Sequence, residues 1–492
     1  MTGHIPFDNS YARLPDSFFS RVLPTPVSEP RLVKLNSALA VQLGLDPEVL
    51  VTPEWVDIFA GQGIPDGAEP IALAYAGHQF GRFVSRLGDG RAILLGELVD
   101  CGGARRDIQL KGAGRTPFSR GGDGRAALGP VLREYIVSEA MAALGIPTTR
   151  ALAAVMTGDS VLRDTPLPGA VLARIASSHI RVGTFEFFAN RGDAEAVRRL
   201  ADYAISRHYP DAAGAAQSYR SFLDQVIARQ AELVARWLHV GFIHGVMNTD
   251  NMSIAGETID YGPCAFMDAY DPATVFSSID YYGRYAYANQ PRIAHWNLTR
   301  VAECLIPLLA EDKDAALEQV KEALGGFAER FNVAYFGGLR RKFGLCQEQE
   351  GDIALMKDLL DRMAANKADF TLTFRRLCDA AADPQADSPV RELFANPVSY
   401  DDWAARWRLR LDQEPLDGDA RRAGMRRVNP AFIPRNHRVE AVIEAAVSRG
   451  DFAPFEELVA VLSAPYEDQP AFATYADPPP PSQGAYQTFC GT

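Results

Sequence analysis

The strongest constraint on the fold is a change in the predicted secondary structure along the chain. Between about 70 and 175 the 492-residue sequence reads as strands with helical interruptions, and beyond about 195 it reads mainly as helices. Strands grouped in one part of a chain and helices in another are typical of α+β proteins. At roughly 150 residues per domain, the length allows about three domains or one large two-lobed unit.

The first predicted strands follow a glycine-rich turn. The turn is Gly88-Asp89-Gly90, and the apolar run Ala92–Val99 after it is predicted to be a strand. Asp107–Lys111 alternates polar and apolar residues, so it is predicted to be a second strand. Ile108 and Leu110 would face the core, and the polar side chains of that strand would lie on its opposite side.

Two helices and a hairpin complete the pattern. Val131–Leu144 is predicted to be a helix in which Glu134 shares a face with apolar residues and so points toward protein. Ser160–Arg163 and Ala170–Ile175 flank a turn-like segment and read as a hairpin. Gln225–Val240 is predicted to be an amphipathic helix, and the polar segment after it carries the densest chemistry.

Composition argues against several classes of function. Against 50 basic residues stand 62 acidic ones, and this net charge of −12 argues against a nucleic acid partner. No signal-peptide pattern and no apolar run of roughly 20 residues is found, so no membrane partner is expected. The cysteines lie far apart without a CxxC pair, which favours a reducing, cytoplasmic location. They are Cys101, Cys264, Cys304, Cys346, Cys378 and Cys490.

Two motifs that lie apart in the sequence suggest phosphate binding. Gly88-Asp89-Gly90-Arg91 lies twenty residues before Lys111, and its glycines and arginine would let backbone and charge approach phosphates. Lys111 on a strand followed by Glu134 on a helix is the order of the ion pair in kinase folds. Taken alone, the first piece also fits an ordinary hairpin turn, and the second also fits a surface pair.

A third piece is the polar segment His244–Asn251, followed by Ile259-Asp260-Tyr261-Gly262. Small-molecule kinases show an asparagine seven residues after such a histidine and then an Asp-Phe-Gly-like turn, and Asn251 and Asp260 fit these positions. An amide oxygen and a carboxylate are ligands suited to Mg²⁺ or Mn²⁺ bridging a triphosphate. The alternative is a polar loop without metal.

One departure from the kinase pattern bears on the reaction. Kinases of this type carry a catalytic aspartate two residues after the histidine, where this sequence has Val246. Valine cannot accept a proton from a substrate hydroxyl, so ordinary kinase chemistry is doubtful. Asp250 is the one carboxylate in the segment 244–251 and is therefore the candidate base.

Further basic residues surround these pieces. The segment Gly112–Arg125 packs glycine and arginine between the lysine strand and the following helix, a composition that can wrap anionic oxygens. Arg174 lies on a predicted strand and Arg181 just beyond it. Either arginine taken singly is expected at the surface; as a set they could neutralise a buried triphosphate.

The sequence resembles the selenoprotein O family of kinase-like protein adenylyltransferases. The resemblance runs over nearly the whole chain. The motifs that carry it are Tyr75–Gly81, Leu87–Arg91, Lys111–Arg125, His244–Met252, Ile259–Pro263, and the stretch from Asn429-Pro430 through Ile433–His437.

This resemblance implies an architecture. It implies a protein-kinase-like, two-lobed α+β fold with a strand-rich N-terminal lobe and a helical C-terminal lobe. The expected divisions are 1–70 as an N-terminal extension packing on the lobes, 71–190 as the N-lobe, 191–475 as the C-lobe with the catalytic and metal-binding loops, and 476–492 as a Pro-rich tail with Cys490.

The resemblance also implies an activity. ATP would be bound in reversed orientation relative to kinases, and AMP would be transferred to Ser, Thr or Tyr hydroxyls of proteins with release of pyrophosphate. Asp250 matches the proton acceptor, Asn251 and Asp260 the metal ligands, and Glu134 the partner of Lys111. The implied nucleotide contacts are Gly88, Gly90, Arg91, Lys111, Asp123, Gly124, Arg174 and Arg181.

The C-terminal Cys490 stands where animal relatives carry selenocysteine. One hypothesis is a regulatory disulfide between Cys490 and Cys264 that pins the tail across the active site; the alternative is a free thiol. Two rival functions also stay open, a kinase that uses the γ-phosphate and a pseudokinase that binds nucleotide only to dock a partner. UMP transfer from UTP with Mn²⁺ is a further alternative to AMP transfer.

Overall fold

A computed structural model describes residues 5–480 and 486–488 of the chain. Helices and antiparallel strands are both abundant in it, which confirms the predicted mixture of helix and sheet. Strands dominate the first part of the chain, and nearly all elements beyond Val182 are helices. None of the described helices combines the length and the apolar character needed to span a bilayer.

The main sheet has eight strands among the described residues, in the order β1-β3-β6-β7-β10-β9-β2, with β8 paired to β10. Two small two-stranded sheets, β4-β5 and β11-β12, lie outside it. The strands are β1 (Phe19–Arg21), β2 (Arg31–Leu35), β3 (Ile71–Leu73), β4 (Gly77–Gln79), β5 (Arg82–Val84), β6 (Ala92–Val99), β7 (Arg105–Lys111), β8 (Ala126–Ala127), β9 (Arg150–Leu162), β10 (Pro166–Ala176), β11 (Phe242–Ile243) and β12 (Ala265–Phe266).

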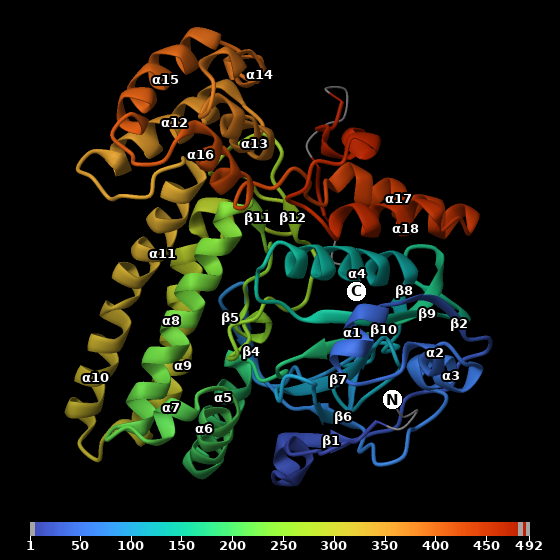
Figure 1. Cartoon of the computed structure of the whole chain (residues 1–492). Helices are drawn as coiled ribbons and strands as arrows, with labels where there is room; N and C mark the ends of the chain where they lie inside the picture. Colours follow the sequence, from blue (N-terminus) through green and yellow to red (C-terminus); the bar gives the residue numbers. More distant parts are fainter. Residues whose placement is uncertain (1–4, 481–485, 489–492) are drawn as a thin grey trace.

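Helices cover both faces of the main sheet (Figure 1). Helices α1 to α3 pack on one face, and α4 packs on the other with α17 and α18 stacked behind it. The helices that cover the main sheet are α1 (Ser37–Gln42), α2 (Pro47–Leu50), α3 (Pro53–Ala60), α4 (Leu128–Ala143), α17 (Asn436–Arg449) and α18 (Ala453–Leu462). Together with the sheet they form one half of the molecule.

The remaining helices form the other half of the molecule, at the left and upper left of Figure 1. They are α5 (Val182–Ala189), α6 (Ala194–His208), α7 (Pro210–Ala213), α8 (Ser218–His239), α9 (Gln290–Leu309), α10 (Lys313–Gly325), α11 (Phe327–Lys342), α12 (Asp352–Asn366), α13 (Phe370–Ala380), α14 (Ser388–Arg391), α15 (Pro397–Leu411) and α16 (Gly418–Arg426).

The predicted elements around the motifs are present, with some shifted ends. Strand β6 has the predicted bounds, whereas β7 and α4 begin two and three residues earlier than predicted. The hairpin β9-β10 is longer than predicted, because β9 already begins at Arg150 and β10 begins at Pro166, where Pro166 and Pro168 pair with Leu162 and Ser160. In β7, Ile108 and Leu110 face the core as predicted, but Gln109 on the opposite side is also buried.

Two neighbouring glycines in α11 test how tightly α8 and α11 pack. A Cβ on Gly338 would lie 1.9 Å from the His239 ring, which is stacked on Tyr335, whereas a Cβ on Gly337 would meet no atom within 4 Å. We expect Gly338→Ala to lower the free energy of unfolding by about 1–3 kcal/mol through overpacking. Gly337→Ala is expected to raise it by about 0.5–1 kcal/mol, because alanine favours the helix. Urea unfolding of both variants measures the difference, and equal effects would contradict this packing.

Candidate active site

Four distant segments meet at one carboxylate. Lys111 at the end of β7 donates from Nζ to Glu134 of α4 at 2.6 Å and to Asp260 at 2.9 Å. The guanidinium of Arg174 in β10 contacts Asp260 at 2.6 Å, and that of Arg181, just before α5, contacts it at 2.5 Å. Three cationic side chains that are far apart in sequence therefore surround Asp260.

Burial of the two arginines differs from the expectation for each of them alone. Arg174 is 1% and Arg181 2% exposed, so neither is a surface residue. Arg174 is also held by Glu134 at 3.1 Å and by Gln109, whose Oε1 accepts two of its N–H groups at 3.2 and 2.5 Å. Buried charge is costly without partners, so the carboxylates and Gln109 hold these guanidinium groups in place.

Asp260 has an unusual backbone and an unusual charge environment. Its φ is +62°, a left-handed conformation that is uncommon for non-glycine residues, although aspartate adopts it more readily than most. Burial would raise the pKa of this carboxyl, but the charges of Lys111, Arg174 and Arg181 outweigh burial and hold the pKa well below its usual range. Asp260 is therefore ionised and suited to a cation.

The candidate catalytic loop, residues 244–251, lies beside this cluster, and Arg181 donates to the carbonyl oxygen of Asp250 at 2.6 Å. Asp250 and Asn251 form a short 3-10 helix, Thr249–Asn251, and His244 upstream reaches the carbonyl oxygen of Ile259 at 2.9 Å through Nε2. Burial raises the pKa of Asp250 to about 6. Its Oδ1 atom is buried and has no hydrogen-bond partner among the described residues. Asp250 lines a cavity together with Asn251 and Asp260, so its carboxylate can accept a proton from a group that enters there.

The glycine turn is packed by the segment that follows Lys111. Gly88 has φ +65°, and a Cβ on it would lie 2.3 Å from the ring of Phe118. A Cβ on Gly90 would lie 3.0 Å from the carbonyl oxygen of Phe118. Thr116 and Ser119 donate from their hydroxyls to the carbonyl oxygens of Asp89 and Gly90. The turn therefore needs glycine for close packing as well as for any approach to phosphate.

Asp123 and Gly124 lie at the rim of the same cavity. Asp123 is paired with Arg163 at 2.8 Å, and this hydrogen bond, with smaller contributions from the Arg125 amide and the Arg163 charge, lowers its pKa. Gly124 has φ +69°, and a Cβ on it would lie 2.0 Å from the carbonyl oxygen of Gly114. Asp123 is thus engaged by protein in this structure, and Arg163 joins the basic side chains of the rim.

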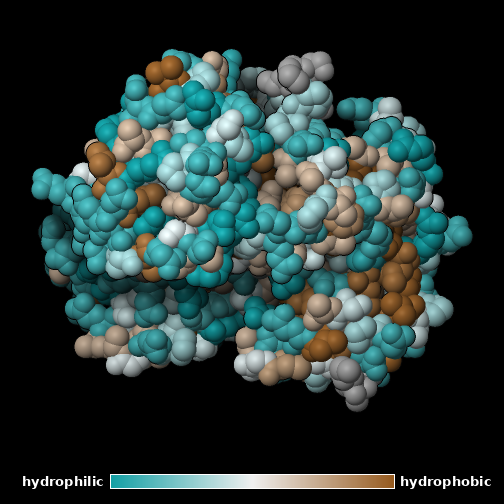
Figure 2. Space-filling model, turned by 45° about the horizontal axis from the view of Figure 1, so that its top comes forward, coloured by the Kyte–Doolittle hydropathy of each residue, from teal (hydrophilic) through white to brown (hydrophobic). Residues whose placement is uncertain are grey.

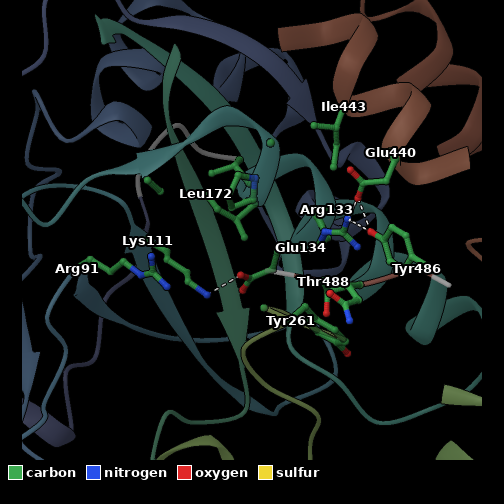
Figure 3. Close-up of a pocket in the computed structure, with 16 residues that line it drawn as sticks. Arg91, Lys111, Arg133, Glu134, Leu172, Tyr261, Glu440, Ile443, Tyr486 and Thr488 are labelled. Atoms are coloured by element: carbon green, nitrogen blue, oxygen red, sulfur yellow. Dashed lines mark hydrogen bonds and ion pairs between the residues drawn. The ribbon is translucent and has the colours of Figure 1, made fainter. Parts of the chain in front are cut away.

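One cavity of about 620 Å³ brings most of the expected site residues together. From that set it is lined by Gly88, Gly90, Arg91, Lys111, Asp123, Gly124, Arg174, Arg181, Asp250, Asn251 and Asp260. Glu134 lies behind Lys111 and lines a second, adjoining cavity of about 300 Å³, which Figure 3 shows. Arg91 and Lys111 line both cavities.

Residues of the C-terminal tail line the second cavity, with Tyr486 beside Arg133 and Glu440 (Figure 3). The hydroxyl of Tyr486 accepts from Arg133 at 2.7 Å and donates to Glu440 of α17 at 2.5 Å. Thr488 donates to the carbonyl oxygen of Pro263 at 2.7 Å. The described part of the tail therefore lies against the segment that follows the metal-ligand candidate Asp260.

The disulfide hypothesis stays a prediction, because Cys490 lies outside the described residues. Cys264 is fully buried, and burial raises the pKa of its thiol to about 12. A disulfide with Cys490 therefore requires Cys264 to become accessible first. Peptide mapping of oxidised protein is expected to find the Cys264–Cys490 link; a map in which neither cysteine is ever joined to the other would contradict it.

Asn251 and Asp260 fit a divalent metal ion by donor chemistry. The Nδ2 of Asn251 donates to the carbonyl oxygen of Val246 at 3.0 Å, which leaves its amide oxygen as a possible ligand. Among the residues that the structure describes, no group of three His, Cys, Asp or Glu side chains could hold a metal. Phosphate oxygens of a substrate would have to complete the coordination, as is usual for Mg²⁺.

Some residues of the site were not predicted from the sequence. Gln109, which bridges Arg174 and Asp89, was assigned only to a polar strand face. Arg163 was placed only at the end of a predicted strand. The β4-β5 hairpin lay within a motif of the family resemblance but received no role. The available signal for Gln109 is its position in a strand that ends at the candidate lysine, whereas its burial is seen only in the structure.

Comparison with known proteins identifies the class of enzyme. A family model described as protein adenylyltransferase SelO matches residues 3–463. Relatives of the same length are named protein nucleotidyltransferases. The chain is therefore a protein nucleotidyltransferase. It belongs to the SelO family of protein adenylyltransferases, which confirms the resemblance found in the sequence.

Two of the similar proteins come from Bradyrhizobium diazoefficiens and Rhodopseudomonas palustris strain BisB5, and both are named protein nucleotidyltransferase YdiU. The first is 68% identical and the second 67% identical, each over 492 residues. In both cases the match covers 100% of this chain and 100% of the relative. The match thus spans the candidate loop 244–251, the three cationic residues around Asp260 and the C-terminal tail.

Proposed function

We propose that the protein transfers AMP from ATP to Ser, Thr or Tyr hydroxyls of other proteins and releases pyrophosphate. The observation that carries this proposal is the set of three cations, Lys111, Arg174 and Arg181, which surround Asp260 and line the larger cavity. Such a cluster is suited to the multiply charged end of a triphosphate. Val246, at the position of the kinase base, argues against γ-phosphate transfer to an acceptor at that point.

The orientation of the nucleotide follows from this assignment. The β- and γ-phosphates lie among Lys111, Arg174 and Arg181, and the α-phosphate is turned toward Asp250. Arg91, the glycine turn and the rim at Asp123 and Gly124 contact the rest of the nucleotide. This is the reversed orientation relative to kinases that the family resemblance implies.

The reaction forms one bond and breaks one bond. The acceptor hydroxyl oxygen attacks the α-phosphorus, and the bond from this phosphorus to the oxygen that bridges it to the β-phosphate breaks. The hydroxyl proton passes to Asp250, and pyrophosphate leaves with the electron pair. Asp250 lines the larger cavity, and burial raises the pKa of its carboxyl to about 6, which supports its role as the proton acceptor.

Asn251 and Asp260 would hold the Mg²⁺ or Mn²⁺ ion. When bound, the ion supplies charge neutralisation to the triphosphate and the departing pyrophosphate. Asp260 has three cationic partners before substrate binds. Phosphate oxygens of the nucleotide can take over these cations, which releases the carboxylate for the metal. Glu134 keeps Lys111 in place during this exchange of partners.

We also propose that the architecture is that of a two-lobed, kinase-like fold. The N-terminal lobe comprises 71–190 and the helical C-terminal lobe 191–475, with 1–70 and 476–492 as extensions. The extension 1–70 adds β1 and β2 to the sheet of the N-terminal lobe, and α17 and α18 of the C-terminal lobe pack back on α4. The pairing of Lys111 on a strand with Glu134 on a helix that covers the sheet supports this assignment. The cavity between sheet and catalytic loop would then be the cleft between lobes.

Transfer of label from ATP to protein tests the proposed reaction. The protein is incubated with an acceptor protein, Mg²⁺ or Mn²⁺, and ATP labelled at either the α- or the γ-phosphate. Label from the α position is expected in protein, and label from the γ position is not. Retention of γ-label would establish a kinase, and no retained label despite nucleotide binding would favour a pseudokinase. A parallel reaction with α-labelled UTP decides between AMP and UMP transfer.

A further inference from the structure

The β4-β5 hairpin lies at the junction of the two halves of the molecule (Figure 1). Its strands, Gly77–Gln79 and Arg82–Val84, pair only with each other among the described residues and are no part of the main sheet. The proposed function gives it no role. Yet it interrupts the chain between β3 and the glycine turn at Gly88, and it packs on the 3-10 helix of the catalytic loop.

The hairpin meets three consecutive residues of the catalytic loop. The backbone amide of Phe80 donates to the Asn248 side chain at 2.9 Å, and the amide of His78 donates to the Thr249 hydroxyl at 2.7 Å. Gly77 faces Asp250. The hairpin therefore contacts each of the three residues that precede Asn251 in the loop.

Gly77 allows Asp250 to come this close. A Cβ on Gly77 would lie 2.3 Å from Oδ1 of Asp250 and 2.7 Å from Leu87. The φ of Gly77 is not positive, so the glycine is needed for space and not for its backbone conformation. Any larger side chain would push the Asp250 carboxylate away from its position.

His78 fixes the hairpin itself. Its Nδ1 lies 2.6 Å from Oε1 of Glu186 in α5, and its ring packs against Phe83 and Trp296 with centroid distances of 4.9 and 5.2 Å. The amide of Ala76 donates to the carbonyl oxygen of Gly183 at 2.9 Å, which ties the hairpin to α5 a second time. The hairpin is thus braced from behind while its backbone holds the loop.

We propose that the β4-β5 hairpin is a positioning element that sets the place of Asp250, with Gly77 and His78 as its positioning residues. The inference rests on the proposed role of Asp250 as proton acceptor. Among the described hydrogen bonds, those of residues 77–84 reach the loop and α5, and none reaches Lys111, Arg174 or Arg181. The link to the cation cluster is indirect, through the carbonyl oxygen of Asp250, which accepts from Arg181 at 2.6 Å. Loss of the hairpin should therefore affect the turnover of bound nucleotide more than the binding of nucleotide.

Gly77→Ala is the first test, with Gly214→Ala as the matched control, because a Cβ on Gly214 meets no atom within 4 Å and its φ is −88°. Hydrogen exchange of a peptide spanning 244–254 is measured in the full-length protein without nucleotide. We expect faster exchange in Gly77→Ala and wild-type exchange in Gly214→Ala. Displacing a catalytic group by about 1 Å can lower the reaction rate by about 10²-fold. We therefore expect kcat for AMP transfer to fall by about that factor, with KM for ATP little changed.

His78 provides a second test that leaves Gly77 intact. Asparagine at 78 can place an N–H near the position of Nδ1 and so keep the contact with Glu186, whereas alanine cannot. We expect His78→Ala to speed exchange of the loop and lower kcat, and His78→Asn to retain most of both. Unchanged exchange in His78→Ala, or faster exchange with unchanged kcat, would overturn the proposal.

The two readouts separate this inference from the proposed function. If the wild-type protein transfers no nucleotide, the proposed function fails, and the exchange rates still show whether the hairpin holds the loop. If the wild-type protein transfers AMP and both variants match it in exchange and kcat, the hairpin inference fails alone.

Discussion

Asp260→Ala is expected to lower AMP transfer by about 10³-fold or more. The change removes a metal ligand, and metal ions contribute several kcal/mol to such reactions, with each 1.36 kcal/mol worth a factor of ten. It also leaves Lys111, Arg174 and Arg181 with less negative charge among them. Steady-state transfer of α-label from ATP to an acceptor protein measures the loss.

Stability must be followed in the same variant. Removing one partner of buried charges typically costs about 3–5 kcal/mol, so Asp260→Ala should also unfold more readily without ligand. Asp314→Ala is a suitable control, because Asp314 is an exposed residue in the first turn of α10. Circular dichroism establishes that the variant is folded at the assay temperature. A folded Asp260→Ala protein with activity near that of Asp314→Ala would refute the metal-ligand role.

Asp250→Asn is expected to lower kcat by about 10²–10⁴-fold, the range for loss of a general base. Asparagine has nearly the shape of aspartate but does not accept a proton at neutral pH. Asp250 contacts none of the three cations around Asp260 through its side chain among the described hydrogen bonds, so nucleotide affinity should stay close to the wild-type value. Calorimetric titration with ATP and Mg²⁺, beside the transfer assay, checks both parts.

The outcome for Asp250→Asn also separates base from binding residue. A base contributes to turnover and a binding residue to affinity. Weakened ATP binding with unchanged kcat would show that Asp250 holds nucleotide and that another group accepts the proton. Val246, at the position of the base in kinases, cannot be that group, because its side chain does not titrate.

Local sequence patterns were sufficient to predict the central strands and helices. Ala92–Val99 forms β6 with the predicted bounds, since it is apolar throughout and follows a clear turn. The short strands β1 and β2 were not predicted, although they pair with β3 and β9 at opposite edges of the sheet. Three- and five-residue strands are too short to show a reliable period, and their pairing partners lie far away in sequence.

The active site was predictable where side-chain chemistry is distinctive. Lys111, Glu134 and Asp260 do meet, as the kinase-like order of motifs suggested. The burial of Arg174 and the bridging by Gln109 were not predictable, because both depend on which side chains face each other across neighbouring strands. Such register is a tertiary property that a single sequence does not display.

The central claim is that the cation cluster grips the far end of the triphosphate and offers its inner phosphorus to the acceptor. A crystal structure of the protein with Mg²⁺ and a non-hydrolysable ATP analogue tests it most directly. We predict the γ-phosphate in contact with Lys111, Arg174 and Arg181, and the α-phosphorus facing Asp250. A structure in which the γ-phosphorus faces Asp250 and the base lies at the deep end of the cavity would contradict it.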